Sequence, residues 1–130
     1  MQVDQRTSLA WIGTVLIVAL CLWPKAWMPV REQTASAPRH TDKVIHFAMF
    51  AAYGILWTRG RTPTPKRAAA VFAGAVVLAV ATELLQGLPV ISRDPDPLDA
   101  LADVVGGFMG IALVSAAGGV VEVDPVPDDA

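Results

Sequence analysis

The segment AAAVFAGAVVLAVATELLQGL, Ala68 to Leu88, decides the fold class that this sequence predicts. It contains no proline, and its one ionisable side chain is Glu83, near its end. A helix of about 20 apolar residues is long enough to cross a hydrocarbon core about 30 Å thick. We therefore expect residues 67–88 to form a helix that spans a membrane.

Three other apolar runs occur in the chain, at Leu9–Trp23, Val44–Trp57 and Leu98–Val121. Of the 130 residues, 17% are charged and 54% are hydrophobic, whereas soluble domains have about 25% charged residues. The mean hydropathy is +0.49. We expect an all-α fold, a four-transmembrane-helix up-down bundle with helices at about 8–24, 42–58, 67–88 and 98–121. This membrane domain, 8–121, would lie between a short N-terminus, 1–7, and an acidic C-terminal tail, 122–130.

The first apolar run has an alternative interpretation as a signal peptide, because the small residues Ala35–Ala37 follow it. This site lies far beyond the apolar run, and Pro38 would follow the cut. Aromatic residues near the two ends of the run are typical of membrane interfaces. We therefore expect a retained helix; the aromatic residues are Trp11, Trp23 and Trp27.

The distribution of basic residues predicts the orientation, because short cytoplasmic loops are enriched in Lys and Arg. The two sides of the predicted bundle hold equal totals of five basic residues each, and the dense loop decides between them. That loop, between the second and third helices, contains Arg59, Arg61, Lys66 and Arg67. We expect it to be cytoplasmic, with both termini on the same side. The net charge of -2 gives no basic surface for nucleic acid.

Ionisable side chains interrupt three of the apolar runs near one end of each. Because successive helices alternate in direction, the start of the second, the end of the third and the start of the fourth share one membrane face. Spacings of three or four residues place polar residues of one helix on a common side. We expect a binding site on the extracytoplasmic side; its candidate residues are Asp42, Lys43, His46, Glu83, Gln86, Arg93, Asp99 and Asp103.

A lone carboxylate at the centre of a membrane helix costs about 2.5–3.5 kcal/mol. The carboxylates should therefore pair with Lys43, His46 or Arg93, or one of them should be protonated. The result would be a polar pocket, or a structural network that joins three helices. The acidic residues and His46 are acceptable metal-ligand types, but no compact metal motif occurs. We predict no cofactor, no metal and no catalytic residue.

Four short motifs together resemble the VanZ-like family. They are DKVIHF (Asp42–Phe47), ELLQ (Glu83–Gln86), Arg93 followed by Asp99, and GGFMG (Gly106–Gly110). The resemblance extends from Asp42 to Leu113. It implies a small bacterial integral membrane protein with mostly four helices and no established reaction. The named member of the family is linked to resistance to the glycopeptide teicoplanin.

One position departs from the family pattern, since Asp103 occupies a place where the family usually has Asn. Asn would be a neutral partner in a polar network, whereas Asp103 adds a carboxylate. This difference leaves open whether the family's polar site is conserved in function here.

The sequence thus favours a multi-pass protein of the bacterial cytoplasmic membrane. Its outward polar pocket would bind a membrane lipid, an anionic lipid headgroup or a cell-wall precursor, with Arg93 and Lys43 meeting anionic groups. Two alternatives stay open. One is a membrane enzyme on a lipid-linked substrate, with Glu83 or Asp99 as acid or base, and the other is a structural subunit of a membrane complex. The sequence does not predict an oligomeric state.

Overall fold

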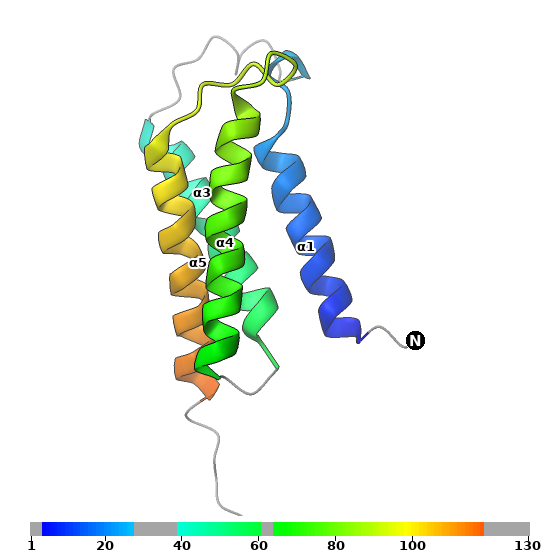
Figure 1. Ribbon diagram of the computed structural model, residues 1–130, viewed down its shortest axis with the longest axis vertical. Helices are drawn as coiled ribbons and strands as arrows, with labels where there is room; N and C mark the ends of the chain where they lie inside the picture. Colours follow the sequence, from blue (N-terminus) through cyan, green and yellow to red (C-terminus); the bar gives the residue numbers. More distant parts are fainter. Residues whose placement is uncertain (1–3, 28–38, 61–63, 119–130) are drawn as a thin grey trace, which may run out of the picture.

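The computed structural model describes residues 4–27, 39–60 and 64–118, and this part of the chain is all-α. Four helices, α1 (Gln5–Cys21), α3 (Arg39–Thr58), α4 (Pro65–Gln86) and α5 (Pro97–Gly118), are joined by the short 3-10 helix η1 (Lys25–Trp27) and by loops. Successive long helices run in opposite directions (Figure 1). The prediction of an all-α fold with four helices is confirmed.

The helix limits follow capping residues rather than hydropathy, and they therefore differ by up to three residues from the predicted ones. The Asp4 side chain accepts a hydrogen bond from the Arg6 backbone, so α1 begins at Gln5, not 8, and it ends at Cys21, not 24. Three residues before the predicted start of the second helix, α3 begins at Arg39.

The other two helices begin with a capping residue followed by proline. Thr64 accepts a bond from the Arg67 backbone and Pro65 opens α4, which ends at Gln86 rather than 88. At the start of α5, the Asp96 side chain accepts a 2.9 Å bond from the Leu98 backbone. Several sequence expectations fall outside the described residues: those for 1–3, Arg31, Ala35–Ala37, Pro38, Arg61, 119–121 and the acidic tail 122–130.

Two helices, α4 and α5, are long and apolar enough to cross a membrane. Only 28% of the residues in the most apolar window of each are buried within the protein. A core helix of a soluble protein would be mostly buried, whereas these helices turn large apolar side chains outward. Examples are Leu84, which is 72% exposed, and Phe108, which is 58% exposed. The protein therefore presents an apolar exterior along these helices.

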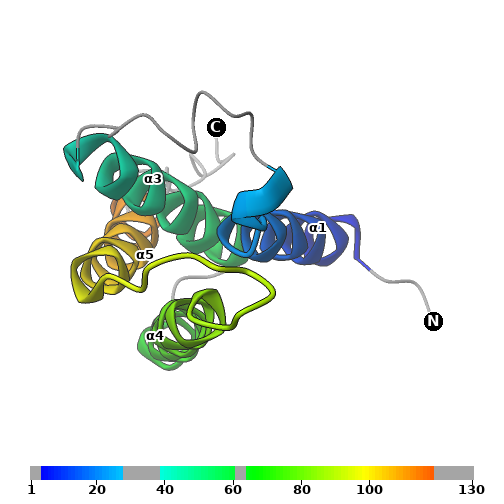
Figure 2. The same cartoon turned by 90° about the horizontal axis from the view of Figure 1, so that it is seen from above.

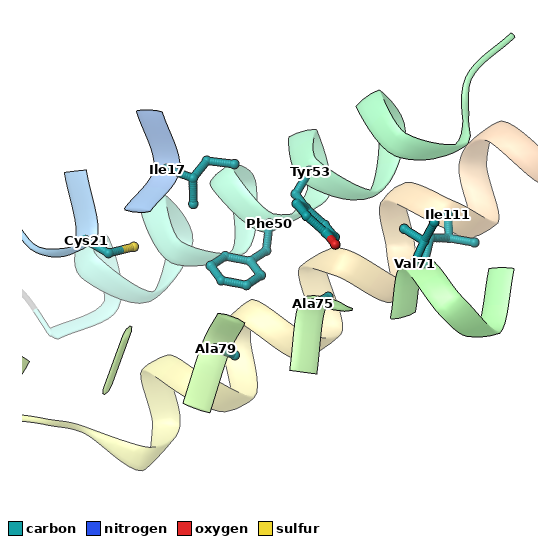
Figure 3. Close-up of a cluster of buried hydrophobic side chains, with 8 residues drawn as sticks. All are labelled: Ile17, Cys21, Phe50, Tyr53, Val71, Ala75, Ala79 and Ile111. Carbon is teal, nitrogen blue, oxygen red and sulfur yellow. The ribbon is translucent and has the colours of Figure 1, made fainter. Parts of the chain in front are cut away.

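The closest helix pair is α3 with α5; α3 lies behind α5 and α4 in Figure 1 and beside α5 in the view from above (Figure 2). Glycines allow this approach, since a Cβ atom on Gly106 would collide with the Phe47 carbonyl oxygen and one on Gly110 with the Ala51 carbonyl oxygen. All four long helices contribute to the buried core (Figure 3), formed by Ile17, Cys21, Phe50, Tyr53, Val71, Ala75, Ala79 and Ile111.

Helix α1 lies at the side of the bundle and is attached near its middle and at its C-terminal end (Figure 1). Near its middle, the Trp57 indole N–H donates a 3.0 Å bond to the Thr14 hydroxyl. The Trp11 and Trp57 rings meet edge to face, with centroids 5.1 Å apart. At the C-terminal end of α1, the Gln86 amide donates a 2.9 Å bond to the Cys21 carbonyl.

Candidate functional site

The start of α3, the end of α4 and the start of α5 meet at one end of the bundle, the upper end in Figure 1. All eight candidate residues from the sequence belong to these segments or to the loop between α4 and α5. Seven of their side chains form three groups of contacts, two between helices α3, α4 and α5 and one beside α1. The eighth, Asp42, offers a carboxylate oxygen within 4.8 Å of ligand-type atoms of His46 and Asp99. We call the whole set, together with Asp96, the polar cluster.

The outermost group is centred on Lys43. Its ammonium lies 2.6 Å from a carboxylate oxygen of Asp96 and 2.8 Å from one of Asp99. The Asp99 side chain is 7% exposed, whereas the Lys43 side chain is 23% exposed and that of Asp96 is 39% exposed. Two charge-assisted bonds therefore connect the first turn of α3 to the beginning of α5, at the edge of the bundle.

A deeper group consists of His46, Glu83 and Asp103, from α3, α4 and α5 respectively. The His46 Nδ1 atom lies 3.0 Å from Asp103 Oδ1, and both residues are buried, at 2% and 0% exposure. Glu83, 7% exposed, accepts a 2.9 Å bond at Oε2 from the Asp96 backbone N–H. One ligand-type atom from each of the three side chains lies within 4.8 Å of the other two.

Two carboxylate oxygens in this deeper group are buried without a hydrogen-bond partner in the part of the chain that the structure describes. They are Glu83 Oε1 and Asp103 Oδ2. A buried acceptor left unpaired costs about 1–3 kcal/mol, and more when it is charged. Native proteins rarely retain such atoms without a reason such as a bound ion, a proton or a water.

The third group lies beside α1 and has a structural role. Gln86 Nε2 and Arg93 Nη1 both donate to the Cys21 carbonyl oxygen, at 2.9 and 3.4 Å. The carbonyl groups of the last helical turn have no partner within their own helix, so these donors satisfy one of them at the end of α1. Gln86 and Arg93 thus turn toward α1 rather than into the deeper group.

The charge balance of the polar cluster is acidic. The cluster contains five carboxylates, those of Asp42, Glu83, Asp96, Asp99 and Asp103, and two side chains that are always cationic, Lys43 and Arg93. The extra carboxylate of Asp103, at the position where the resemblance suggests Asn, is bonded to His46. This balance favours a cationic ligand over an anionic one.

Asp96 is the member of the cluster that was not among the residues predicted from the sequence. It bonds Lys43 through its side chain and Glu83 through its backbone N–H. Its signal in the sequence is the Asp-Pro pair of residues 96–97, since Asp is a preferred N-cap and Pro a preferred first residue of a helix.

A second site lies at the opposite end of the bundle, between α1, the end of α3 and the start of α4. It is a cavity of about 600 Å³ with apolar and aromatic walls and two cationic side chains. Its lining residues are Trp11, Tyr53, Trp57, Thr64, Lys66, Arg67, Ala70 and Val71. In the sequence, Lys66 and Arg67 predicted only the orientation, and no cavity was expected at this end.

The two ends of the molecule therefore offer different chemistry. The polar cluster can hold a cation among carboxylates, and the cavity, which we call the aromatic-basic cavity, can hold an apolar chain with an anionic end. Compared with protein-family models, with curated proteins and with solved structures, the chain matched none.

Proposed function

We propose that this chain is a membrane protein whose four helices all cross the bilayer, and that it binds an anionic lipid in the aromatic-basic cavity. Support for two further spans comes from the outer faces of α1 and α3. Val15 of α1 is 63% exposed, and Ile45 of α3 is 50% exposed. With a rise of about 1.5 Å per residue, the 17 residues of α1 extend over most of a hydrocarbon core about 30 Å thick.

The main support for lipid binding is the composition of the cavity. Three aromatic side chains, those of Trp11, Tyr53 and Trp57, offer the apolar contact that an acyl chain requires. Lys66 and Arg67 belong to the first turn of α4, where cations and unpaired backbone N–H groups favour an anionic group. A phosphate-bearing amphiphile therefore complements both parts of the site.

The charges at the opposite end support this choice of site. The sequence alone suggested that Lys43 and Arg93 would meet an anionic headgroup. In the folded protein Lys43 lies between two carboxylates, and the cluster around it is acidic. An anion would meet repulsion there, so the basic end is the better place for it. With the predicted orientation, that end faces the cytoplasmic leaflet, in which anionic lipids are common.

The resemblance to the VanZ-like family supports a role in the cell envelope. A membrane protein that binds anionic lipids or lipid-linked wall precursors could change how a glycopeptide reaches its target. We expect that expression of this chain in a susceptible Gram-positive host raises its tolerance of teicoplanin. Measurement of growth across a teicoplanin dilution series, with the empty vector as control, tests this expectation.

Lipid binding is tested with protein in nanodiscs or mild detergent. Native mass spectrometry should detect retained phosphatidylglycerol on the wild-type protein, and more of it than phosphatidylcholine supplied at the same concentration. The double variant Lys66→Ala/Arg67→Ala should bind phosphatidylglycerol at least about tenfold more weakly, a loss of about 1.4 kcal/mol.

The matched control is Arg59→Ala, which removes an exposed cation at the same end that does not line the cavity. This variant should retain the lipid as the wild type does. Equal retention by the double variant and the wild type, or equal affinity for the two phospholipids, would contradict the proposed site.

A further inference from the structure

Helices α3, α4 and α5 each contribute one buried ionisable side chain to a single point inside the bundle. These are His46, Glu83 and Asp103, and we call them the buried triad. Each is more than nine-tenths buried, with exposures of 2%, 7% and 0%. Metal sites in helical bundles are commonly built in this way, from His and acidic side chains that face one another on neighbouring helices.

Two atoms of the buried triad point to a ligand that the described part of the chain does not supply. Glu83 Oε1 and Asp103 Oδ2 are buried and have no hydrogen-bond partner among the residues that the structure describes. Buried carboxylate oxygens rarely lack both a hydrogen bond and a bound ion, so these oxygens need another partner. A divalent cation would satisfy both and would neutralise the two carboxylates together.

We infer that the buried triad binds one divalent first-row transition-metal ion. The ligand-type atoms of the triad lie within 4.8 Å of one another. Two ligands of a tetrahedral zinc ion, each at about 2.0–2.2 Å from it, are about 3.3–3.6 Å apart, so side-chain rotations that move these atoms by about 1 Å close the site. An imidazole with two carboxylates suits Zn²⁺ or Mn²⁺ better than Mg²⁺ or Ca²⁺, which prefer oxygen ligands alone.

Further side chains near the triad are arranged as in known metal sites. His46 Nδ1 and Asp103 Oδ1 lie 3.0 Å apart, close to the separation of two ligands on one metal ion. Asp42 and Asp99 also offer oxygens within 4.8 Å of a His46 nitrogen and of each other. These carboxylates add negative charge around the ion and could complete its coordination. The inference does not depend on the proposed lipid binding, which concerns the opposite end of the protein.

The first test is metal binding by protein that carries no polyhistidine tag, purified in detergent and cleared of metal with a chelator. Calorimetric titration with Zn²⁺ should give one ion per chain. Three variants, His46→Gln, Glu83→Gln and Asp103→Asn, should each weaken Zn²⁺ binding at least about tenfold. The matched controls are His40→Gln and Asp94→Asn, which change exposed residues and should bind as the wild type does.

A second test leaves the buried triad intact, and it therefore holds even where a triad variant fails to fold. The chain has two histidines, so in His40→Gln the remaining one is His46. Pulsed electron paramagnetic resonance of Mn²⁺ bound to this variant should show coupling to an imidazole nitrogen. The Lys66→Ala/Arg67→Ala protein should bind the metal normally, which separates this inference from the lipid proposal.

Three results would overturn the inference. They are the absence of stoichiometric Zn²⁺ or Mn²⁺ binding by the wild type, the absence of an imidazole nitrogen coupling in His40→Gln, and Mg²⁺ or Ca²⁺ binding as tight as that of Zn²⁺. In that case the triad would be a hydrogen-bonded network that joins the three helices.

Discussion

Lys43 illustrates how a single side chain organises the acidic end of this protein. Lys43 is one of the two permanent cations of the polar cluster, which also contains five carboxylates. Its ammonium bonds Asp96 and Asp99 at the same time. Both carboxylates belong to the start of α5, whereas Lys43 belongs to the first turns of α3. Its charge therefore offsets the repulsion between two acidic residues and joins two helices.

We expect Lys43→Met to lower the melting temperature, because Asp99 is buried and would lose its charge partner. Thermal unfolding in detergent, followed by circular dichroism, measures the change. Lys25→Met is the matched control, since Lys25 is exposed. The double variant Lys43→Met/Asp99→Asn should lose less stability than the sum of the two single variants. The reason is that Asp99→Asn also removes the repulsion between Asp96 and Asp99 that Lys43 offsets. Additive losses would show that the two charges do not interact.

At the scale of the helices, the contact between α3 and α5 depends on residues without a side chain. Gly106 and Gly110 of α5 face the carbonyl oxygens of Phe47 and Ala51, and a Cβ on Gly54 of α3 would meet the backbone of α5. Backbone atoms cannot rotate away as a side chain can. Any larger residue must therefore separate the two helices.

We expect Gly106→Ala and Gly110→Ala each to destabilise the protein by about 1–3 kcal/mol, the usual cost of overpacking. Gly118→Ala, at the exposed end of the same helix, is the control and should leave stability unchanged or slightly raised. Reversible unfolding in mixed detergent, monitored by circular dichroism, gives the free energy of unfolding. If Gly106→Ala were as stable as the wild type, α3 and α5 would have to be farther apart than they are in the structure.

Helix α1 is attached to the bundle by a few side-chain contacts, and Trp57 of α3 provides one of them. We expect Trp57→Phe to destabilise the protein by about 1 kcal/mol, because the bond to Thr14 is lost while most of the apolar contact remains. Trp27→Phe changes a Trp that is 70% exposed and should have little effect. The same unfolding measurement compares the two variants. An equal effect of both changes would argue against the docking of α1 through Trp57.

The whole molecule is a bundle with an apolar outer surface and two chemically different ends. The acidic polar cluster lies at one end, and the aromatic-basic cavity lies at the other. In a membrane this polarity would place the two sites in opposite leaflets. The orientation of the protein therefore decides which compartment supplies each ligand.

We expect the end with the basic loop to be cytoplasmic, because short loops rich in Lys and Arg stay on that side. Single cysteines placed at exposed positions, Arg59→Cys at that end and Asp94→Cys at the other, test this in a Cys21→Ser background. A membrane-impermeant maleimide should label Asp94→Cys in intact cells. It should label Arg59→Cys only after permeabilisation. The reverse pattern would invert the topology.

The sequence by itself determined the number and type of the helices. Long apolar runs separated by proline-bearing polar segments form helices in an apolar environment, because a helix satisfies its own backbone hydrogen bonds without water. Alternating helix directions also predicted that polar residues near one end of three runs would lie together, as Lys43 with Asp99 and His46 with Asp103 do. These conclusions depend on local periodicity and chain direction, which a sequence records directly.

Only the tertiary structure decided which polar atoms meet. Helical spacing places a residue on a face but does not fix the depth or rotation of one helix against another. The close glycine contacts between α3 and α5 set both, and they bring Lys43 to Asp96 and His46 to Asp103. The sequence also could not predict the aromatic-basic cavity or the two carboxylate oxygens that lack a partner among the described residues, because each depends on residues from three separate helices.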